Sequence, residues 1–278
     1  MTVANILTVD LEDWYHICGV RGRIPPPERL ESRVVPNARR ILERLAHRRV
    51  RATFFVLGVV AERHPGLIRE IAEAGHEIAL HGQAHRRVYT LDREGFRRDL
   101  LEARDRVSNL AGREVRGYRA PEWSIREDSL WALDVLREEG FAYDSSMAPL
   151  PLIGSRAYPV IPHRVRKGKG GDLWEFPPLV GTTRLLSVPL GGGWGLRLFP
   201  FAWVRSAVRD LNRAGHPAVI FLHPREFDPA PPRIPLPLVK RFVLHAGFEP
   251  TARRLERLLR AFPFGPVSDH LPGSEPRV

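Results

Sequence analysis

The chain contains very little cysteine: Cys18 is the only one in 278 residues. A single cysteine excludes an intramolecular disulfide, which is typical of proteins from reducing compartments, and we therefore expect a cytoplasmic protein. The sequence also lacks apolar runs of the roughly 18 residues that span a membrane, so we expect no integral membrane segment. The first seven residues lack the basic and apolar regions of a signal peptide, and none is expected.

Lysine is scarce as well, with three residues against a net charge of +11, so arginine carries the positive charge. The arginines are scattered along the chain, for example as Arg39-Arg40 and Arg97-Arg98, and are not interleaved with aromatic residues in one tract. Because nucleic-acid-binding proteins concentrate their basic residues, we expect no nucleic-acid partner. The segment 164–171 is the exception, being basic and glycine-rich, and we expect it to be a flexible surface loop.

Strand-like and helix-like segments alternate along the chain, whose length and 43% hydrophobic fraction fit one large α/β domain. Such alternation predicts a mainly parallel sheet with the helices outside. Strands are predicted at 6–9, 52–57, 77–80, 116–119, 174–176 and 218–222, and helices at 36–48, 61–74, 91–110, 127–139 and 201–214. The proline-rich segments between them are interpreted as long ordered loops.

Ionisable residues follow four of the predicted strands. Asp10 ends the first, His81 the third, Arg119 the fourth and His223 the last. In parallel α/β barrels the carboxyl ends of the strands meet at one rim, where active sites are built. A lone histidine at a strand end is usually structural, but ionisable residues from four separate strands indicate a catalytic site at this rim.

His81 and His85, together with the acids after the first strand, predict a site for one divalent metal. Two imidazoles and a carboxylate suit Zn²⁺ best, with Co²⁺, Ni²⁺ and Fe²⁺ as alternatives, and three protein ligands leave a coordination position open. Alternate residues of a strand share a face, which puts Glu12 on the same side as Asp10 and makes Glu12 the first choice for the third ligand. Asp13 is the second choice.

In order and spacing, five segments resemble the motifs of the polysaccharide deacetylases, the chitooligosaccharide-deacetylase type of carbohydrate esterase. The segments are 8–13, with Asp10, Glu12 and Asp13; His81 to His85; Arg119-Ala120-Pro121; 172–177, with Trp174; and Leu222-His223-Pro224. The family carries two adjacent aspartates in the first segment, whereas the second acid is displaced here. The resemblance covers residues 5–225 and implies a distorted (β/α) barrel of about seven strands.

The resemblance also implies a function: metal-dependent removal of N-acetyl groups from the sugars of a polysaccharide or lipid-linked oligosaccharide. By the same resemblance, Asp10 is the general base, Arg119 pairs with it and keeps it oriented and ionised, and His223 is the general acid for the departing amine. The metal and a backbone N–H near residues 85–87 would stabilise the oxyanion. The residues expected to contact the substrate are Trp174, Pro121 and Leu222.

Finer features resemble a bacterial subgroup found in exopolysaccharide clusters linked to exosortase sorting. They are the segments 10–15, 223–227 and 262–264. The subgroup implies a catalytic barrel at 1–226 and a C-terminal extension at 227–278 that packs on it. Glu226 is interpreted either as a residue that fixes the tautomer of His223 or as an exposed loop acid. Trp123 either stacks on the sugar or belongs to the core, and His16, His76 and His163 are assigned structural roles.

Two other functions fit parts of the pattern. A hydrolase of another amide, as in allantoinase-like or imide-hydrolysing relatives, shares the fold, but such relatives tend to lose metal ligands and both histidines are present here. A carbohydrate-binding relative without activity is favoured where Asp10 or His223 is missing, and the chain has both.

Overall fold

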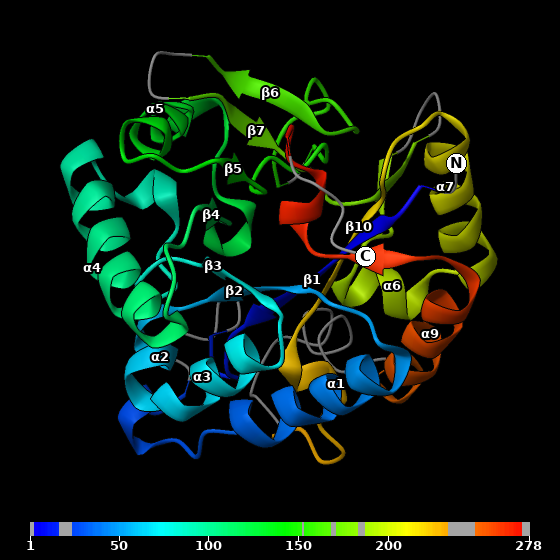
Figure 1. Ribbon diagram of the computed structural model, residues 1–278, viewed down its shortest axis with the longest axis horizontal. Helices are drawn as coiled ribbons and strands as arrows, with labels where there is room; N and C mark the ends of the chain where they lie inside the picture. Colours follow the sequence, from blue (N-terminus) through cyan, green and yellow to red (C-terminus); the bar gives the residue numbers. More distant parts are fainter. Residues whose placement is uncertain are drawn as a thin grey trace.

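Parallel strands form a curled, half-barrel sheet at the centre of the protein, and helices cover its outside (Figure 1). The computed structural model describes residues 3–16, 24–151, 153–167, 171–182, 187–232 and 248–273, so Cys18 lies outside the described residues. The strands are β1 (Asn5–Leu11), β2 (Thr53–Val56), β3 (Glu77–Leu80), β4 (Gly117–Tyr118), β5 (Tyr143–Asp144), β6 (His163–Arg166), β7 (Leu173–Glu175), β8 (Val180–Thr182), β9 (Ser187–Pro189), β10 (Val219–Leu222) and β11 (Phe264–Gly265). The helices are α1 (Val34–Arg48), α2 (Gly58–Arg63), α3 (Pro65–Glu73), α4 (Arg93–Ala111), α5 (Trp131–Glu138), α6 (Gly193–Leu198), α7 (Phe201–Arg213) and α9 (Phe248–Ala261).

The main sheet has the strand order β10-β1-β2-β3-β4-β5-β7-β6, and β11 also pairs with β1. Its pairings are parallel except for β6, which runs antiparallel to β7 at the edge. Beyond β10, the N–H of Leu179 donates to the carbonyl of Val219 and the N–H of Phe221 donates to that of Gly191. The chain that follows β7 thus covers the free edge of β10. The mainly parallel sheet with outer helices is confirmed.

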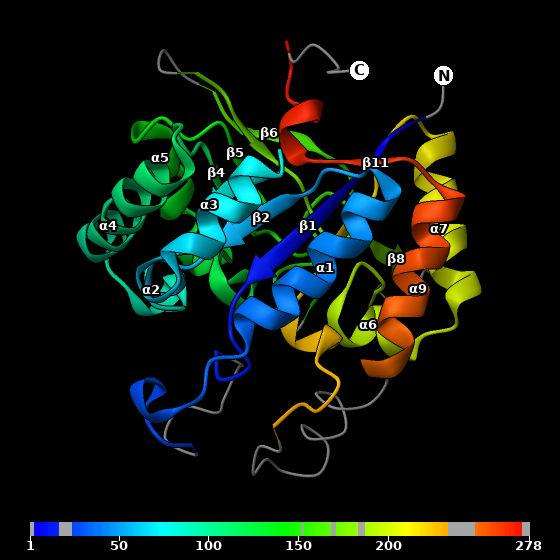
Figure 2. The same cartoon turned by 60° about the horizontal axis from the view of Figure 1, so that its bottom comes forward.

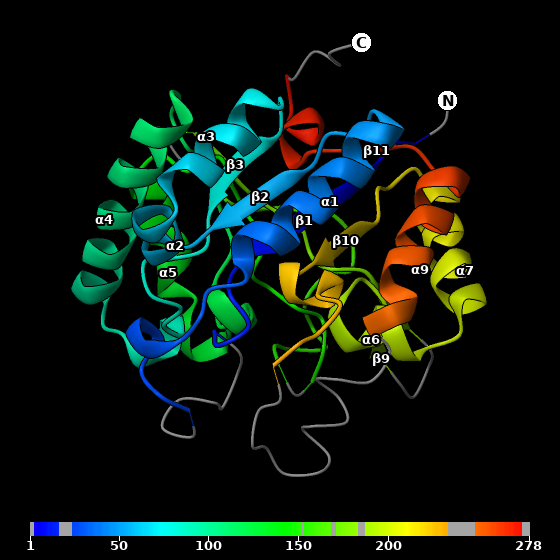
Figure 3. The same cartoon turned by 90° about the horizontal axis from the view of Figure 1, so that it is seen from below.

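Side chains alternate between the two faces of β1. Leu7, Val9 and Leu11 belong to the large apolar core between the sheet and the helices. Thr8 accepts a hydrogen bond from Arg119 on the inner face, where Asp10 lines a cavity. The arrowhead of β1 points to the lower side of Figure 2, so the carboxyl ends of the parallel strands open on that side. Figure 3 shows α1, α2 and α3 in front of the sheet, with α4 and α5 to their left and α7 and α9 to their right, beyond β10.

Three predicted segments differ from the structure. The single helix expected at 61–74 is two helices, because Pro65 has no N–H to donate and starts α3 instead of continuing α2. The helix expected at 127–139 begins as a separate 3₁₀ turn at Glu127–Ser129. Part of the basic segment 164–171 is strand β6, which pairs with β7, so it is not wholly a flexible loop.

Within the described part of the chain, no helix combines the length and the apolar character that crossing a membrane requires.

Candidate metal centre and active site

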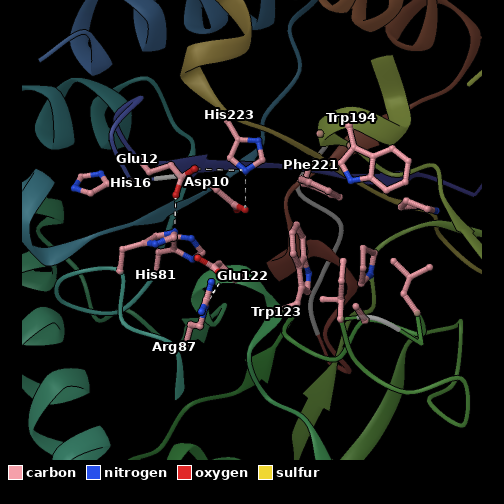
Figure 4. A pocket seen from close by; sticks show the side chains of 18 of the residues that line it. Asp10, Glu12, His16, His81, Arg87, Glu122, Trp123, Trp194, Phe221 and His223 are labelled. Atoms are coloured by element: carbon pink, nitrogen blue, oxygen red, sulfur yellow. Dashed lines mark hydrogen bonds and ion pairs between the residues drawn. The ribbon is translucent and has the colours of Figure 1, made fainter. Parts of the chain in front are cut away.

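Residues predicted for the site converge at the carboxyl ends of the strands (Figure 4). Asp10 belongs to β1, and Glu12 is the first residue after this strand. His81 is the first residue after β3, and His223 is the first after β10. These four side chains and His85 line one cavity of about 520 Å³. Asp10 and Glu12 both line this cavity, which agrees with the shared face predicted for them.

Arg119 is fully buried and holds Asp10 in place. Its Nη1 donates to Oδ1 of Asp10 at 2.6 Å and to Oγ1 of Thr8 at 2.8 Å. Its Nε and Nη2 donate to the carbonyl and the hydroxyl of Ser145, and the guanidinium lies 4.2 Å from the centre of the Phe55 ring. The predicted contact between Arg119 and Asp10 is therefore present. It uses Oδ1 of Asp10, whereas Oδ2 lies 3.8 Å from Nε2 of His223.

Glu12, His81 and His85 form a cluster whose ligand atoms all lie within 4.8 Å of one another. Nε2 of His85 lies 2.7 Å from Oε2 of Glu12. Nδ1 of His81 lies 2.8 Å from the carbonyl oxygen of Arg119, which orients the ring and leaves Nε2 for a ligand. Two ring nitrogens and one carboxylate are a donor set that suits zinc and its neighbours, so the residues present fit a divalent metal.

The protonation states of His81 and Glu12 agree with this use. Burial lowers the pKa of His81 to about 4, so its imidazole is neutral and able to act as a ligand. Burial alone would raise the pKa of Glu12, but the charge of His85 and its hydrogen bond outweigh burial and hold this pKa well below its usual value. Glu12 is therefore an anion, which is the form that binds a cation. Burial lowers the pKa of His85, but the charge of Glu12 and its hydrogen bond outweigh burial and raise it, so a metal would replace the proton on His85 when it binds.

The turn between the two histidines requires left-handed backbone. Gly82 has a φ of 79°, and His85 itself has a φ of 54°. A positive φ is uncommon for a residue with a Cβ and occurs where the surrounding structure holds it. Here the N–H of Gln83 donates to Oδ2 of Asp99 at 2.8 Å, which anchors the turn to α4. His85 is thus directed back towards His81 and Glu12.

Asp13 is not part of this cluster, and the structure does not support it as the alternative ligand. Its carboxylate accepts hydrogen bonds from the hydroxyl of Ser32, from the N–H of Trp14 at 2.9 Å and from the N–H of Arg33 at 3.1 Å. These bonds fasten the loop after β1 to the start of α1. Of the two acids left open by the sequence, the geometry favours Glu12.

His223 faces both carboxylates and is backed by a buried acid. Its Nε2 lies 3.7 Å from Oε1 of Glu12, and its Nδ1 lies 3.7 Å from Oε1 of Glu226. Glu226 pairs with the buried Arg197 of α6. Burial raises the pKa of Glu226, but the charge of Arg197 outweighs it and lowers this pKa to about 2. Glu226 is therefore a buried anion behind His223, and its interpretation as an exposed loop acid is wrong.

The three residues predicted to contact substrate do not line the described cavity. Leu222 faces the outer helices, because it lies one residue from Phe221 on β10 and side chains alternate along a strand. Trp174 packs against the inner cluster of Phe55, Tyr143 and Phe176. Pro121 is buried near Gly82.

Trp123, Phe221 and Trp194 line the cavity instead. The ring centroids of Trp123 and Phe221 are 4.4 Å apart. Glu122 and Trp123 both have a positive φ, 59° and 50°, and an ion pair from Arg87 to Glu122 holds this turn. Trp123 therefore lies in the cavity wall, partly buried against a small apolar cluster, and its stacking on a sugar stays a prediction. Phe221 was within reach of the sequence, since it is the same-face neighbour of His223, whereas nothing local indicated Trp194.

His16, for which the sequence predicts a structural role, also lies at the site. It lines the cavity, and its ring stacks on that of His85 with centroids 6.0 Å apart. Its Nδ1 accepts a hydrogen bond from the N–H of Asp13 at 3.0 Å, and burial lowers its pKa to about 4. The neutral ring thus braces the second histidine of the cluster.

Residues 31–142, which carry His81, His85 and Arg119, match the family model described as polysaccharide deacetylase. This part of the chain is a polysaccharide deacetylase domain. Asp10 and His223 lie outside the match. Residues 145–272 match a second model, a domain of unknown function (DUF3473). The two matches meet at β5, and strands from both form the one sheet that holds the candidate site.

Among curated proteins, the deacetylase domain is similar to a chitooligosaccharide deacetylase from Sinorhizobium fredii. The two are 40% identical over 98 residues, which cover 34% of this chain and 42% of that protein. The chain spans less than half the length of the curated relatives that it matches.

Solved structures confirm the deacetylase fold. A probable polysaccharide deacetylase from Pseudomonas aeruginosa has a TM-score of 0.61 at 18% identity, covering 92% of this chain and 83% of that one. An allantoinase has a TM-score of 0.59 at 19% identity, with the same coverage of 92% and 83%. The fold is thus common to hydrolases of different amides, and the choice between them depends on the site.

Proposed function

We propose that the protein is a metal-dependent hydrolase that removes N-acetyl groups from sugar residues. The observation that carries this proposal is the metal-ligand cluster of Glu12, His81 and His85, which lies in the same buried cavity as Asp10 and His223. A metal-dependent amide hydrolase needs metal ligands, a base and an acid around one amide, and candidates for all three come together here from the ends of β1, β3 and β10. The family match adds the N-acetylated sugar as the substrate.

Glu12, His81 and His85 would hold the divalent metal, with Zn²⁺ as our first choice. When bound, such a metal polarises the amide carbonyl and makes water a better nucleophile. The hydrogen bond between His81 and the carbonyl of Arg119 orients one ligand, and the stacking of His16 orients the other. Asp13 would stabilise the loop that carries Glu12, through its hydrogen bonds with Ser32 and Arg33.

Asp10 would be the general base. One of its oxygens is occupied by Arg119, while the other faces the cavity side of His223. Because Arg119 is held by Thr8 and Ser145 as well, it fixes the direction in which Asp10 accepts a proton. A base held in this way loses little freedom when the substrate binds.

His223 would be the general acid that protonates the departing amine. The anionic Glu226 behind Nδ1 favours a proton on that nitrogen and supports the imidazolium that forms during turnover. Arg197 keeps Glu226 ionised. The oxyanion donor near residues 85–87 stays a prediction.

The biological setting is also a proposal. We propose a cytoplasmic enzyme of exopolysaccharide biosynthesis, with a catalytic barrel at 1–226 and an extension at 227–278. The described part of that extension contributes β11, which pairs with β1, and α9.

Acetate release from a panel of N-acetylated glycans, with and without chelator, tests the proposed activity. We expect release that chelator abolishes and that added Zn²⁺ restores. Allantoin serves as the competing amide, and glycan binding without release would indicate an inactive relative. Release that neither chelator nor Asp10→Asn affects would contradict the proposal.

A further inference from the structure

Most of the cavity wall beyond the metal ligands and His223 is apolar. This apolar lobe is formed by Trp123, Leu150, Leu179, Val180, Trp194 and Phe221. All but Trp123 lie in residues 145–272, the part matched by the family of unknown function. Figure 4 shows Trp123, Phe221 and Trp194 together, on the side of His223 away from His16. An acetamide offers a single methyl group, so this wall is much larger than deacetylation alone requires.

The lobe reaches the surface at an aromatic ridge, which consists of Trp194, Leu198, Phe199 and Trp203. Trp194 lines the cavity and is 37% exposed. The ring centroids of Trp194 and Phe199 are 5.9 Å apart, and so are those of Phe199 and Trp203. The large hydrophobic side chains exposed in the described residues are Trp194, Leu198 and Trp203, and all of them are on this ridge. Exposed apolar surface gathered in one place indicates contact with an apolar partner.

Besides His223, whose buried Nδ1 has no hydrogen-bond partner in the described part of the chain either, two residues that line the cavity carry buried N–H groups without acceptors. Among the described residues, Nε and Nη1 of Arg225 and Nε1 of Trp123 are buried and have no hydrogen-bond partner. Buried donors of this kind are normally satisfied, so their presence in a cavity points to acceptor atoms on a ligand. Because the guanidinium is cationic, its best acceptor is an anionic oxygen such as that of a phosphate.

Arg225 is close to the catalytic end of the cavity, since it lies on the turn Pro224–Phe227 directly after His223. In a 2-acetamido sugar, the carbon that bears the acetamide is bonded to the anomeric carbon. A phosphate on the anomeric carbon therefore lies beside the amide. When the amide lies at Asp10 and His223, such a phosphate falls within reach of Arg225, which is two positions from His223 in the sequence.

We propose that the substrate is a lipid-linked sugar, in which an N-acetylated sugar is joined through an anomeric phosphate or diphosphate to a long hydrocarbon chain. This inference rests on the proposed function and names its substrate class. The phosphate binds Arg225, and the chain runs along the apolar lobe to the aromatic ridge. Hydrolysis adds one water across the amide, releases acetate and leaves an amine on the same lipid.

Binding is tested first, in the full chain carrying Asp10→Asn so that the probe is not consumed. The probe is N-acetylglucosamine diphosphate attached to a farnesyl chain, and UDP-N-acetylglucosamine supplies the sugar and diphosphate without the chain. We expect the farnesyl probe to bind at least about tenfold more tightly. Added Trp194→Ala and Arg225→Gln should each weaken binding of the farnesyl probe about tenfold, with partial recovery in Arg225→Lys.

Arg213→Gln is the matched control for the loss of one positive charge. Arg213 ends α7, pairs with Asp210 and has a side chain that is 78% exposed. Because it lies about ten residues along the helix from Trp203, its replacement should leave the affinity for the farnesyl probe unchanged.

Kinetics then separate this inference from the proposed function. In the chain with Asp10 intact, kcat/KM for the farnesyl-linked sugar should exceed kcat/KM for a soluble chitooligosaccharide. Trp194→Ala should reduce this preference for the farnesyl-linked sugar. Equal affinity for the farnesyl probe and UDP-N-acetylglucosamine would overturn the inference and leave the deacetylase proposal standing. Tight binding of the farnesyl probe without acetate release from any sugar would overturn the proposed function instead. Binding of the protein to lipid vesicles is measured as well, with and without the farnesyl-linked sugar in the vesicle. Equal binding to the two kinds of vesicle would indicate membrane docking alone and would also overturn the inference.

Discussion

Arg119 donates to Asp10 across the sheet, from Nη1 to Oδ1 at 2.6 Å, and both side chains are buried. The two residues are far apart in sequence and meet because β1 and β4 end at the same rim. A carboxylate that is buried beside a guanidinium is oriented by it, so the role that we propose for Asp10 depends on Arg119, although Arg119 does not line the cavity.

Arg119→Gln should therefore remove most of the activity. The change takes away the charge that holds Asp10 and leaves this carboxylate buried without it, so we expect kcat to fall by at least about 100-fold. Steady-state kinetics measure the loss, and Arg39→Gln, which breaks an exposed ion pair with Glu70 on the outside of the sheet, is the control. Wild-type kcat in a folded Arg119→Gln protein would show that Asp10 needs no such support.

Replacing the two candidate acids should give opposite results for metal content. Glu12→Gln removes a ligand of the cluster, and we expect metal bound after purification to fall from about one per chain to a small fraction. Asp13→Asn should keep the metal, because this side chain binds Ser32 and Arg33, but should lower the melting temperature. Elemental analysis with thermal denaturation distinguishes the two. Metal loss in Asp13→Asn alone would reverse our assignment of the third ligand.

Glu226→Gln should destabilise the fold and change its response to acid. The change removes the negative charge facing buried Arg197, which we expect to cost about 3 kcal/mol of unfolding free energy. The pKa of Glu226 is lowered from 4.5 to about 2 in the folded protein, so its contribution is present above pH 4.5 and is lost as the pH falls towards 2. Urea unfolding at several pH values should show a smaller loss in acid for Glu226→Gln than for the wild type.

The double variant Arg197→Met with Glu226→Gln is the control for this pair. It removes both charges, and we expect it to be more stable than Glu226→Gln alone. If the two variants were equally unstable, lost packing and not lost charge would explain the effect.

Asp144 and Glu175 should make stability fall at higher pH. Both are buried, and burial raises the pKa of Asp144 to about 6 and that of Glu175 well above its usual value. A raised pKa means that the folded state binds the proton more strongly, so this stabilisation is full in acid and is lost as the pH rises through 6. Asp144→Asn removes one of the two ionisations and should make the unfolding free energy fall less steeply with pH. The replacement of an exposed acid, Asp210→Asn, should leave this pH dependence unchanged. Unfolding free energies at a series of pH values provide the measurement, and parallel curves for wild type and Asp144→Asn would contradict it.

Much of the candidate site is predictable from the sequence because its residues follow strands. The alternation along β1 indicated that Asp10 and Glu12 share a face, and the apolar runs before His81, Arg119 and His223 indicated a common rim. Substrate contacts were not predictable in this way. Trp174 and Leu222 lie on or beside predicted strands, yet Leu222 points outward and Trp174 packs in an inner cluster away from the cavity wall.

The amino-acid sequence alone is enough to predict the parallel α/β fold, the His81–His85 pair and the position of Asp10 at the end of a buried strand. It is enough because strand periodicity and the order of elements are local properties of the chain. The preference for Glu12 over Asp13 comes from the tertiary structure, since it depends on Ser32 and Arg33 reaching Asp13 from the start of α1. The same is true of Trp194 and Arg225: a cavity wall is assembled from segments far apart in sequence, and no local pattern records which of their side chains face one another.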